Sequence, residues 1–288
     1  MPLAYLALGG GLGDVVWDFL HHRLTPFLPG LVRDFSYRIR VITCCHNDGV
    51  VDLFKHHPWV HEHVTEQWNL PSEGQEARFN GPIDGFFPLR DSTLAVHTGQ
   101  VIVREIPRFY LSADEQAWAD DLLSQRPVIT LQPYAGLSDR DGFDDLRLGH
   151  LCEYLVALDP DVRVLVLGKN HERGHKYTHE TCTFEHPRVI NLIDRVGIRV
   201  GIYLVERSDA FAGAHSNLVR TAWDARRRNA CVMPSPSMTD ALHHIDAKYL
   251  YGFNHPETRA FTYGFANGGL RHFEQLDTLG IARHLLGR

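Results

Sequence analysis

The chain has 288 residues, enough for two domains of ordinary size that each bury a core. Hydrophobic residues make up 44% and charged residues 22%, which excludes a disordered chain. The formal net charge of −6 argues against an extended basic surface for nucleic acid. No apolar run approaches the roughly 20 residues that span a bilayer, and no basic segment precedes the apolar N-terminus. We therefore expect a soluble, cytoplasmic protein without membrane insertion.

Short apolar runs alternate with amphipathic segments in the first part of the chain. This alternation predicts βα units and a parallel sheet. Residues 71–108 are rich in glycine, proline and polar side chains, and they predict loops with a few short strands. Before them we expect strands over residues 4–8, 37–43 and 64–68, and helices over 14–23 and 50–56.

A second βα series begins near residue 127. Ser112 and Glu115 have the spacing of a capping box, which predicts a helix over residues 112–124. Since the series restarts, the sequence predicts an α/β protein with two domains, 1–115 and 116–288, and a boundary between residues 108 and 127. In the second series we expect strands over residues 127–132, 162–167, 188–192, 210–213, 230–234 and 247–252, and helices over 148–158, 197–206, 218–226 and 276–286.

A glycine-rich turn joins the first predicted strand to the first predicted helix, and it ends in Gly11-Leu12-Gly13-Asp14. Glycines let the backbone turn sharply, and the amides at a helix start favour an anion. Asp14 breaks the dinucleotide fingerprint, and no Gly-Lys-Ser/Thr of a P-loop is present. Two interpretations stay open: Asp14 is a general base presented at the end of the sheet, or it only caps the helix.

This turn resembles the opening motif of the heptosyltransferases, glycosyltransferase family nine. The passage from Val51 to Val64 is similar to the family's short helix and its Asn-Pro-x-Val-Asp-x-Val segment. The resemblance implies two Rossmann-like lobes of the GT-B type with a cleft between them. It also implies that Gly11 and Gly13 contribute to substrate binding and that Asp14 deprotonates the acceptor hydroxyl.

The second half of the chain resembles the donor-binding lobe of that family. The segment over residues 128–136 looks like its first strand and phosphate-side loop, ending in Gly136. Arg140 stands where the family has a lysine that contacts the donor phosphate, and Glu172 where a glutamate contacts the ribose. Val196 matches the position that contacts the nucleotide base. These roles are what the resemblance implies.

Residues 210–222 stand where the family reads Asp-Ser-Gly-Pro-x-His-x-Ala. His215 replaces the aspartate, Asn217 the glycine and Arg220 the histidine. Ser216 and Asn217 can cap the following helix, so that its free amides face the donor. Arg220 could hold a phosphate as a bidentate donor, or it could be a solvated helix residue.

Other residues invite a metal or nucleic-acid interpretation. The chain has 19 histidines, some of them clustered at residues 56–63, but the His-Glu-x-x-His spacing of zinc proteases is missing. We expect surface and inter-lobe histidines, with no metal and no cofactor. The run Arg226-Arg227-Arg228 fits a solvated helix C-terminus better than a nucleic-acid patch.

The sequence thus predicts an inverting, metal-independent glycosyltransferase of the hexosyl- or heptosyltransferase type. Its substrate is a nucleoside-diphosphate sugar, and the acceptor is a glycan, a lipid-linked glycan or a modified nucleobase. The replacements at His215, Asn217 and Arg220 motivate an alternative, a catalytically silent protein that binds a nucleotide or a partner. A weaker alternative is a transferase acting on modified bases in DNA, which the acidic net charge disfavours.

Overall fold

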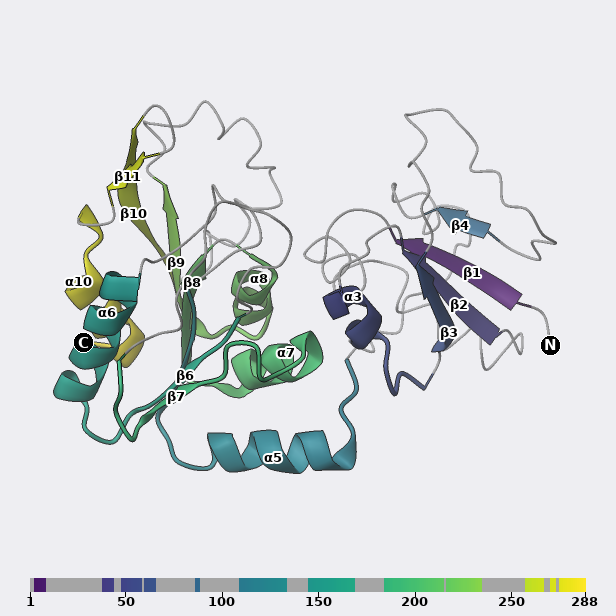
Figure 1. Ribbon diagram of the computed structural model, residues 1–288, viewed down its shortest axis with the longest axis horizontal. Helices are drawn as coiled ribbons and strands as arrows, with labels where there is room; N and C mark the ends of the chain where they lie inside the picture. The colour runs from purple at the N-terminus through teal and green to yellow at the C-terminus, as the bar shows by residue number, and fades with distance from the viewer. Residues whose placement is uncertain are drawn as a thin grey trace. The chain divides into compact units, whose positions relative to one another are not determined.

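The computed structural model forms two compact units, Met1–Ser112 and Ala113–Arg288 (Figure 1). Within the described residues, no helix has the length and apolar character needed to cross a membrane. The structure describes residues 3–8, 38–43, 48–58, 60–65, 86–88, 109–133, 145–168, 184–214, 216–234, 257–266, 270–272 and 275–288.

Unit 1 contains a parallel sheet with the strand order β3-β2-β1-β4. The strands are β1 (Leu3–Leu8), β2 (Arg38–Thr43), β3 (Val60–Thr65) and β4 (Phe86–Pro88), and helix α3 (Asp48–Leu53) connects β2 to β3. The third strand expected over residues 64–68 is present as β3, but it begins four residues earlier than predicted. Residues 66–68 lie outside the described residues. β3 is an edge strand that carries half-exposed polar side chains, so its apolar signal is weak.

His57, four residues after the end of α3, is buried. His57 is only 4% exposed, and its ring meets that of Tyr110 edge-on with centroids 5.0 Å apart. Burial lowers the pKa of His57 to about 4 because the charged imidazolium loses its hydration. The expectation of surface and inter-lobe histidines is therefore wrong for His57, whereas His56 and His61 are exposed.

Unit 2 contains six parallel strands in the order β7-β6-β5-β8-β9-β10, and β11 pairs antiparallel with β10. Counted along the unit, the parallel strands read 3-2-1-4-5-6, the order of the Rossmann fold. The α/β prediction is confirmed. The strands are β5 (Val128–Gln132), β6 (Arg163–Val166), β7 (Val189–Asn191), β8 (Ala210–Ala214), β9 (Arg228–Pro234), β10 (Thr258–Ala266) and β11 (Leu270–His272).

Helices cover both faces of this sheet, as the parallel strands require (Figure 1). On one face, Leu148, Leu151 and Leu155 of α6 join Ile281 and Leu285 of α10 in a core with the strand side chains. On the other face α7 packs against α8 and α5. These helices are α5 (Ala113–Leu123), α6 (Asp145–Leu158), α7 (Ile198–Arg207), α8 (Asn217–Asp224) and α10 (Thr278–Leu286).

Helices α5 and α7 are joined by an ion pair in which the arginine is buried and the glutamate is 32% exposed. The guanidinium of Arg199 is 2% exposed and donates two hydrogen bonds to Glu115, of 3.0 and 2.7 Å. One turn further along α7, the Tyr203 hydroxyl donates to Asp120 over 2.7 Å. The first helix of unit 2 is thus fixed to the helix that follows β7.

At the end of the chain, the C-terminal helix α10 packs on α6 and on the sheet of unit 2. The last strand of the parallel series is β10, which the sequence pattern did not predict. The strand expected over residues 247–252 and the helix expected over 14–23 lie outside the described residues.

Candidate ligand-binding site

The strand order of unit 2 identifies a candidate site by itself. The chain winds outward in one direction from β5 through β6 to β7, and in the other from β8 through β9 to β10. In such sheets ligands bind outside the carboxyl ends of the strands, where the winding reverses. In unit 2 this point lies between the carboxyl ends of β5 and β8, at Gln132 and Ala214.

A side-chain hydrogen bond joins these two strand ends. Gln132, the last residue of β5, is 8% exposed, and its Oε1 accepts a hydrogen bond from the Ser216 hydroxyl. Gly213 pairs with Gln132 in the sheet. A Cβ at Gly213 would lie 2.7 Å from the Phe211 ring and 2.9 Å from the Gln132 carbonyl oxygen. The close packing at this point therefore requires glycine.

Helix α8 begins directly after Ser216 and contains Asn217 and Arg220 in its first turn. It was expected over residues 218–226 and runs from Asn217 to Asp224. Leu218, Val219 and Ala222 are buried against the sheet. The amides of a first helical turn have no partner within their helix, and together with the macrodipole they favour an anion. The N-terminus of α8 lies at the switch point and can therefore accept a phosphate.

The ends of β6 and β7 form the other side of this edge. Gly168 has a φ of 142°, which favours glycine, and its carbonyl accepts a 3.0 Å hydrogen bond from the Asp194 amide. The Asn191 side chain accepts a 3.0 Å bond from the Ile193 amide. These bonds fix the turn that presents the half-buried Val196 just ahead of α7.

Val196 and Ser216 therefore belong to the same edge of one sheet. The strands that precede them, β7 and β8, are separated by β6 and β5. Three steps between neighbouring strands amount to about 14 Å. An extended nucleoside diphosphate has about this length. The family resemblance implies that Val196 contacts the base and that Ser216 lies near the phosphates.

The other predicted site residues cannot be placed. Each of them follows a strand whose order in the sheet is known: Gly11, Gly13 and Asp14 follow β1, Gly136 and Arg140 follow β5, Glu172 follows β6, and His215 follows β8. Gly11, Gly13, Asp14, Gly136, Arg140, Glu172 and His215 lie outside the described residues, as do the side chains of Asn217 and Arg220.

Gln132 was not among the residues predicted for the site. The sequence does carry a signal for it, because a long polar side chain ends a strand of apolar and β-branched residues, Val-Ile-Thr-Leu. Its contact with Ser216 joins residues 84 positions apart. That contact becomes visible only when β8 is known to lie beside β5.

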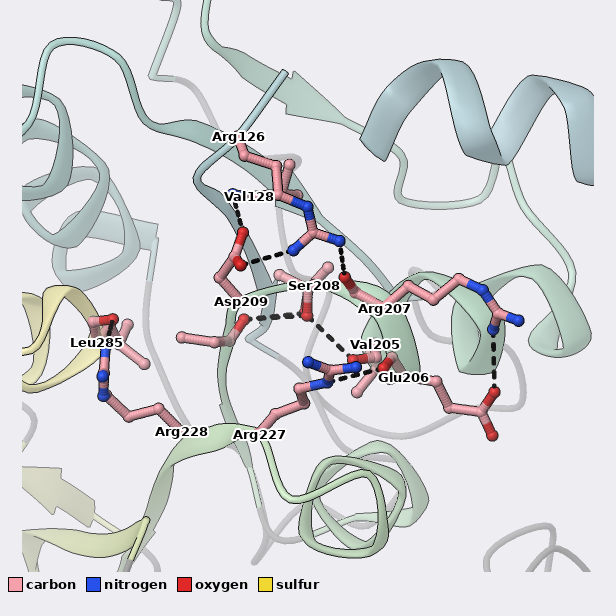
Figure 2. A network of polar contacts seen from close by, with 12 residues as sticks. Arg126, Val128, Val205, Glu206, Arg207, Ser208, Asp209, Arg227, Arg228 and Leu285 are labelled. Carbon is pink, nitrogen blue, oxygen red and sulfur yellow. Dashed lines mark hydrogen bonds and ion pairs between the residues drawn. The ribbon is translucent and has the colours of Figure 1, made fainter. Parts of the chain in front are cut away.

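At the opposite, amino-terminal edge of the sheet, the polar side chains bond to other groups of the chain. We call these networks closed. Figure 2 shows Arg126 facing Asp209, with a 2.5 Å bond to its Oδ1, while the Val128 amide donates to Oδ2 over 2.8 Å. Arg227 and Arg228 donate to carbonyls at the ends of two other helices, Glu206 O of α7 and Leu285 O of α10. These two arginines therefore stabilise the ends of other helices. The expectation that residues 226–228 form a helix C-terminus is wrong, because α8 ends at Asp224 and Arg228 begins β9.

The described residues contain no group of three histidine, cysteine, aspartate or glutamate side chains that could hold a metal ion. Cys152 and Cys231 are free and buried. Burial raises the pKa of the Cys231 thiol to about 12, so it is not a nucleophile near neutral pH.

Comparison with known proteins identifies solved structures with a similar fold. No family model and no curated protein matches the chain. Among solved structures it is similar to the ADP-heptose LPS heptosyltransferase II of E. coli, with 13% identity, a TM-score of 0.55, and 99% of this chain and 98% of that chain covered. A glycosyl transferase of family 9 from Veillonella parvula has 10% identity, a TM-score of 0.59, and coverage of 100% and 98%. The E. coli heptosyltransferase WaaC with ADP has 10% identity, a TM-score of 0.57, and coverage of 99% and 99%.

At such low identities these likenesses establish the fold and nothing finer. They extend over nearly the whole length of both chains, so they include both units. The chain has the GT-B-like fold of these glycosyltransferases. The resemblance that the sequence motifs indicated is confirmed at this level.

Proposed function

We propose that this protein transfers a sugar from a nucleoside-diphosphate sugar to an acceptor hydroxyl, with inversion and without a metal ion. The observation that carries the proposal is the carboxyl edge of unit 2, where Val196 follows β7 and Ser216 follows β8, two strands on either side of the switch point that lie three strand spacings, about 14 Å, apart. The GT-B-like fold shared with heptosyltransferases supports it.

On this proposal the donor extends along that edge. Val196 contacts the base, Glu172 the ribose, and the N-terminal amides of α8 the diphosphate, with Gly136, His215, Ser216 and Asn217 around it. Arg140 and Arg220 supply positive charge. Fixed dipoles and guanidinium groups that face the departing diphosphate lower the barrier, because its negative charge grows in the transition state.

Asp14 is the proposed general base, and Gly11 and Gly13 shape the turn that presents it. Its carboxylate accepts the proton of the acceptor hydroxyl as that oxygen forms a bond to the anomeric carbon. The bond from this carbon to the diphosphate oxygen breaks on the opposite side. The configuration inverts, and the nucleoside diphosphate leaves with the electron pair.

Donor binding is tested by thermal shift against ADP-, GDP-, UDP- and TDP-sugars. ADP compounds come first, because the similar WaaC structure is described with ADP. A ligand at 100 times its Kd adds about 2.7 kcal/mol of stability. Arg140→Ala and Arg220→Ala should each weaken binding by about 1–3 kcal/mol, whereas Arg226→Ala, an exposed residue past α8, should not. Unchanged affinity in the first two variants contradicts the phosphate assignment.

Catalysis is tested by Asp14→Asn, which keeps the size of the side chain and removes its basicity. Transfer should fall about 10²–10⁴-fold while donor affinity stays nearly constant. Asp18→Asn, the same change four residues later, serves as the matched control. Full transfer activity in Asp14→Asn would assign the base to another residue.

A second candidate is a catalytically silent nucleotide-binding protein. The replacements at His215, Asn217 and Arg220 favour it, because they fall in the motif that is assigned to the diphosphate. Binding of a nucleotide sugar with neither hydrolysis nor transfer to any acceptor would support this candidate over the first.

A further inference from the structure

Gln132 is an unusual residue to find at the centre of this sheet. It lies at the end of β5, and the four strand residues before it, Val128–Leu131, are buried. Its own side chain is 8% exposed, and it carries two groups that need hydrogen bonds, a carbonyl oxygen and an NH₂. The NH₂ is not enclosed in the protein interior, so a group outside the sheet can reach it.

One half of this amide has a partner. Oε1 accepts the hydroxyl proton of Ser216, the residue that precedes α8. Nε2 makes no hydrogen bond to any residue in the part of the chain that the structure describes. Because both atoms belong to one planar group, Nε2 is held next to the N-terminus of α8.

We propose that Gln132 is a phosphate-binding residue: its Nε2 donates to a diphosphate oxygen at the N-terminus of α8, while its Oε1 holds Ser216 in place. The inference rests on the proposed function and deepens it, since it names a donor group that the sequence motifs did not assign. Gln132 and the amides of α8 then face the same anion from two sides.

The choice of glutamine has a physical reason. A lysine at the end of a buried strand would lose its hydration and pay a large desolvation cost whenever the ligand is absent. A neutral amide costs far less to bury, and it still forms a charge-assisted hydrogen bond when the diphosphate arrives. The site can therefore be empty without an uncompensated charge in the sheet.

Two substitutions separate the binding role from a structural one. Gln132→Glu keeps the acceptor for Ser216 but replaces the donor by a negative charge, and Gln132→Met removes both groups at similar volume. Isothermal titration measures ADP, adenosine and pyrophosphate on the full chain. We expect ADP and pyrophosphate to bind about 10–100-fold more weakly in both variants, with adenosine affinity unchanged. Gln125→Glu, exposed beyond the other end of β5, should change nothing.

The pH dependence of ADP affinity separates a binding role of Gln132 from a purely structural one. Near a bound anion the pKa of the new carboxyl is raised, so it is protonated as the pH falls. The loss of ADP affinity in Gln132→Glu relative to wild type should therefore shrink from pH 8 to pH 5, and in Gln132→Met it should not. Should Gln132→Glu prevent folding, the titrations of Gln132→Met decide the matter.

Each outcome has a distinct meaning. If ADP binds equally well to wild type and both variants, the role of Gln132 is wrong and the proposed function stands. If pyrophosphate binds wild type but not the variants while no nucleoside diphosphate binds, the inference stands and the proposed donor class is wrong. If wild type binds neither ligand, both are overturned.

Discussion

The two edges of the sheet in unit 2 carry polar groups of similar kinds and use them in opposite ways. At the amino edge, the Asp209 carboxylate accepts hydrogen bonds from Arg126 and from the Val128 amide (Figure 2). Ser208 bonds to Thr130 and to two backbone carbonyls. At the carboxyl edge, Gln132 has a partner for one half of its amide, and a helix N-terminus begins beside it.

Under the proposed function, the amino edge contributes to stability and the carboxyl edge contributes to donor binding. Groups that bind one another lose nothing when the protein is alone in water, and they gain nothing from a ligand. Groups at the carboxyl edge keep hydrogen-bonding capacity that only an outside molecule can use. Changes in the closed networks should therefore alter the free energy of unfolding, and changes at the carboxyl edge should mainly alter affinity.

The largest stability effect is expected at the ion pair between Glu115 of α5 and Arg199 of α7. Glu115→Ala removes both hydrogen bonds that the carboxylate accepts from the buried Arg199, so unfolding should become easier by about 3 kcal/mol. Urea denaturation measures this free energy. Glu206→Ala is the matched control, because its pair with Arg207 on α7 is exposed and should contribute at most about 1 kcal/mol. Equal losses in the two variants would contradict the burial argument.

A pH effect is expected at His57 in unit 1, because its imidazole is buried. Its pKa is about 4 in the folded protein and about 6.5 in the unfolded chain, so between these values the unfolded chain binds more protons. The stability is complete above pH 6.5 and is lost as the pH falls through 4. The full loss is about 3 kcal/mol.

His57→Phe removes this titration and keeps an aromatic ring against Tyr110. Denaturation curves at pH 7 and pH 4 should show that wild type loses about 3 kcal/mol more than the variant. His61→Gln changes an exposed histidine and should follow the wild type. A variant with the wild-type loss would assign the acid sensitivity to other groups.

A smaller stability effect is expected at Gly213, where the carboxyl edge is most closely packed. Gly213→Ala places a methyl group within 3 Å of the Phe211 ring and the Gln132 carbonyl oxygen, and it should cost about 1–3 kcal/mol. Gly201→Ala in α7 meets no atom within 4 Å and should stabilise the helix by up to about 1 kcal/mol. Thermal melts of both variants check the opposite signs.

The sequence predicted most of the fold because many strands in unit 2 are buried and read as continuous apolar runs. β5 and β8, for example, were expected within one residue of their observed bounds. Strands near an edge were harder to predict. β3 carries His61, Glu62 and His63, and β10 contains the exposed Arg259, so neither has a clear apolar period.

The candidate site was predictable in its outline and not in its contacts. The motif order put Val196 and Ser216 after strands, and the carboxyl ends of parallel strands meet at one edge. The hydrogen bond between Gln132 and Ser216 depends on β8 lying beside β5, with β6 and β7 on the far side. Local sequence does not contain that order, because it is set by how the whole sheet winds.

The smallest effect on stability is expected at Asp209, a charged residue at the amino edge of the sheet in unit 2. This variant tests directly whether the two edges of the sheet act independently. Asp209→Ala removes the acceptor for the Val128 amide and for Arg126. The side chains of Arg126 and Asp209 are 48% and 38% exposed, so the ion pair itself contributes little. We expect a loss of about 1 kcal/mol in the free energy of unfolding, mostly from the amide hydrogen bond.

The affinity of Asp209→Ala for ADP should stay at the wild-type value, because the substitution lies at the end of β8 away from α8. A titration in which Asp209→Ala weakens ADP binding as much as Gln132→Met would show that the two edges are not independent.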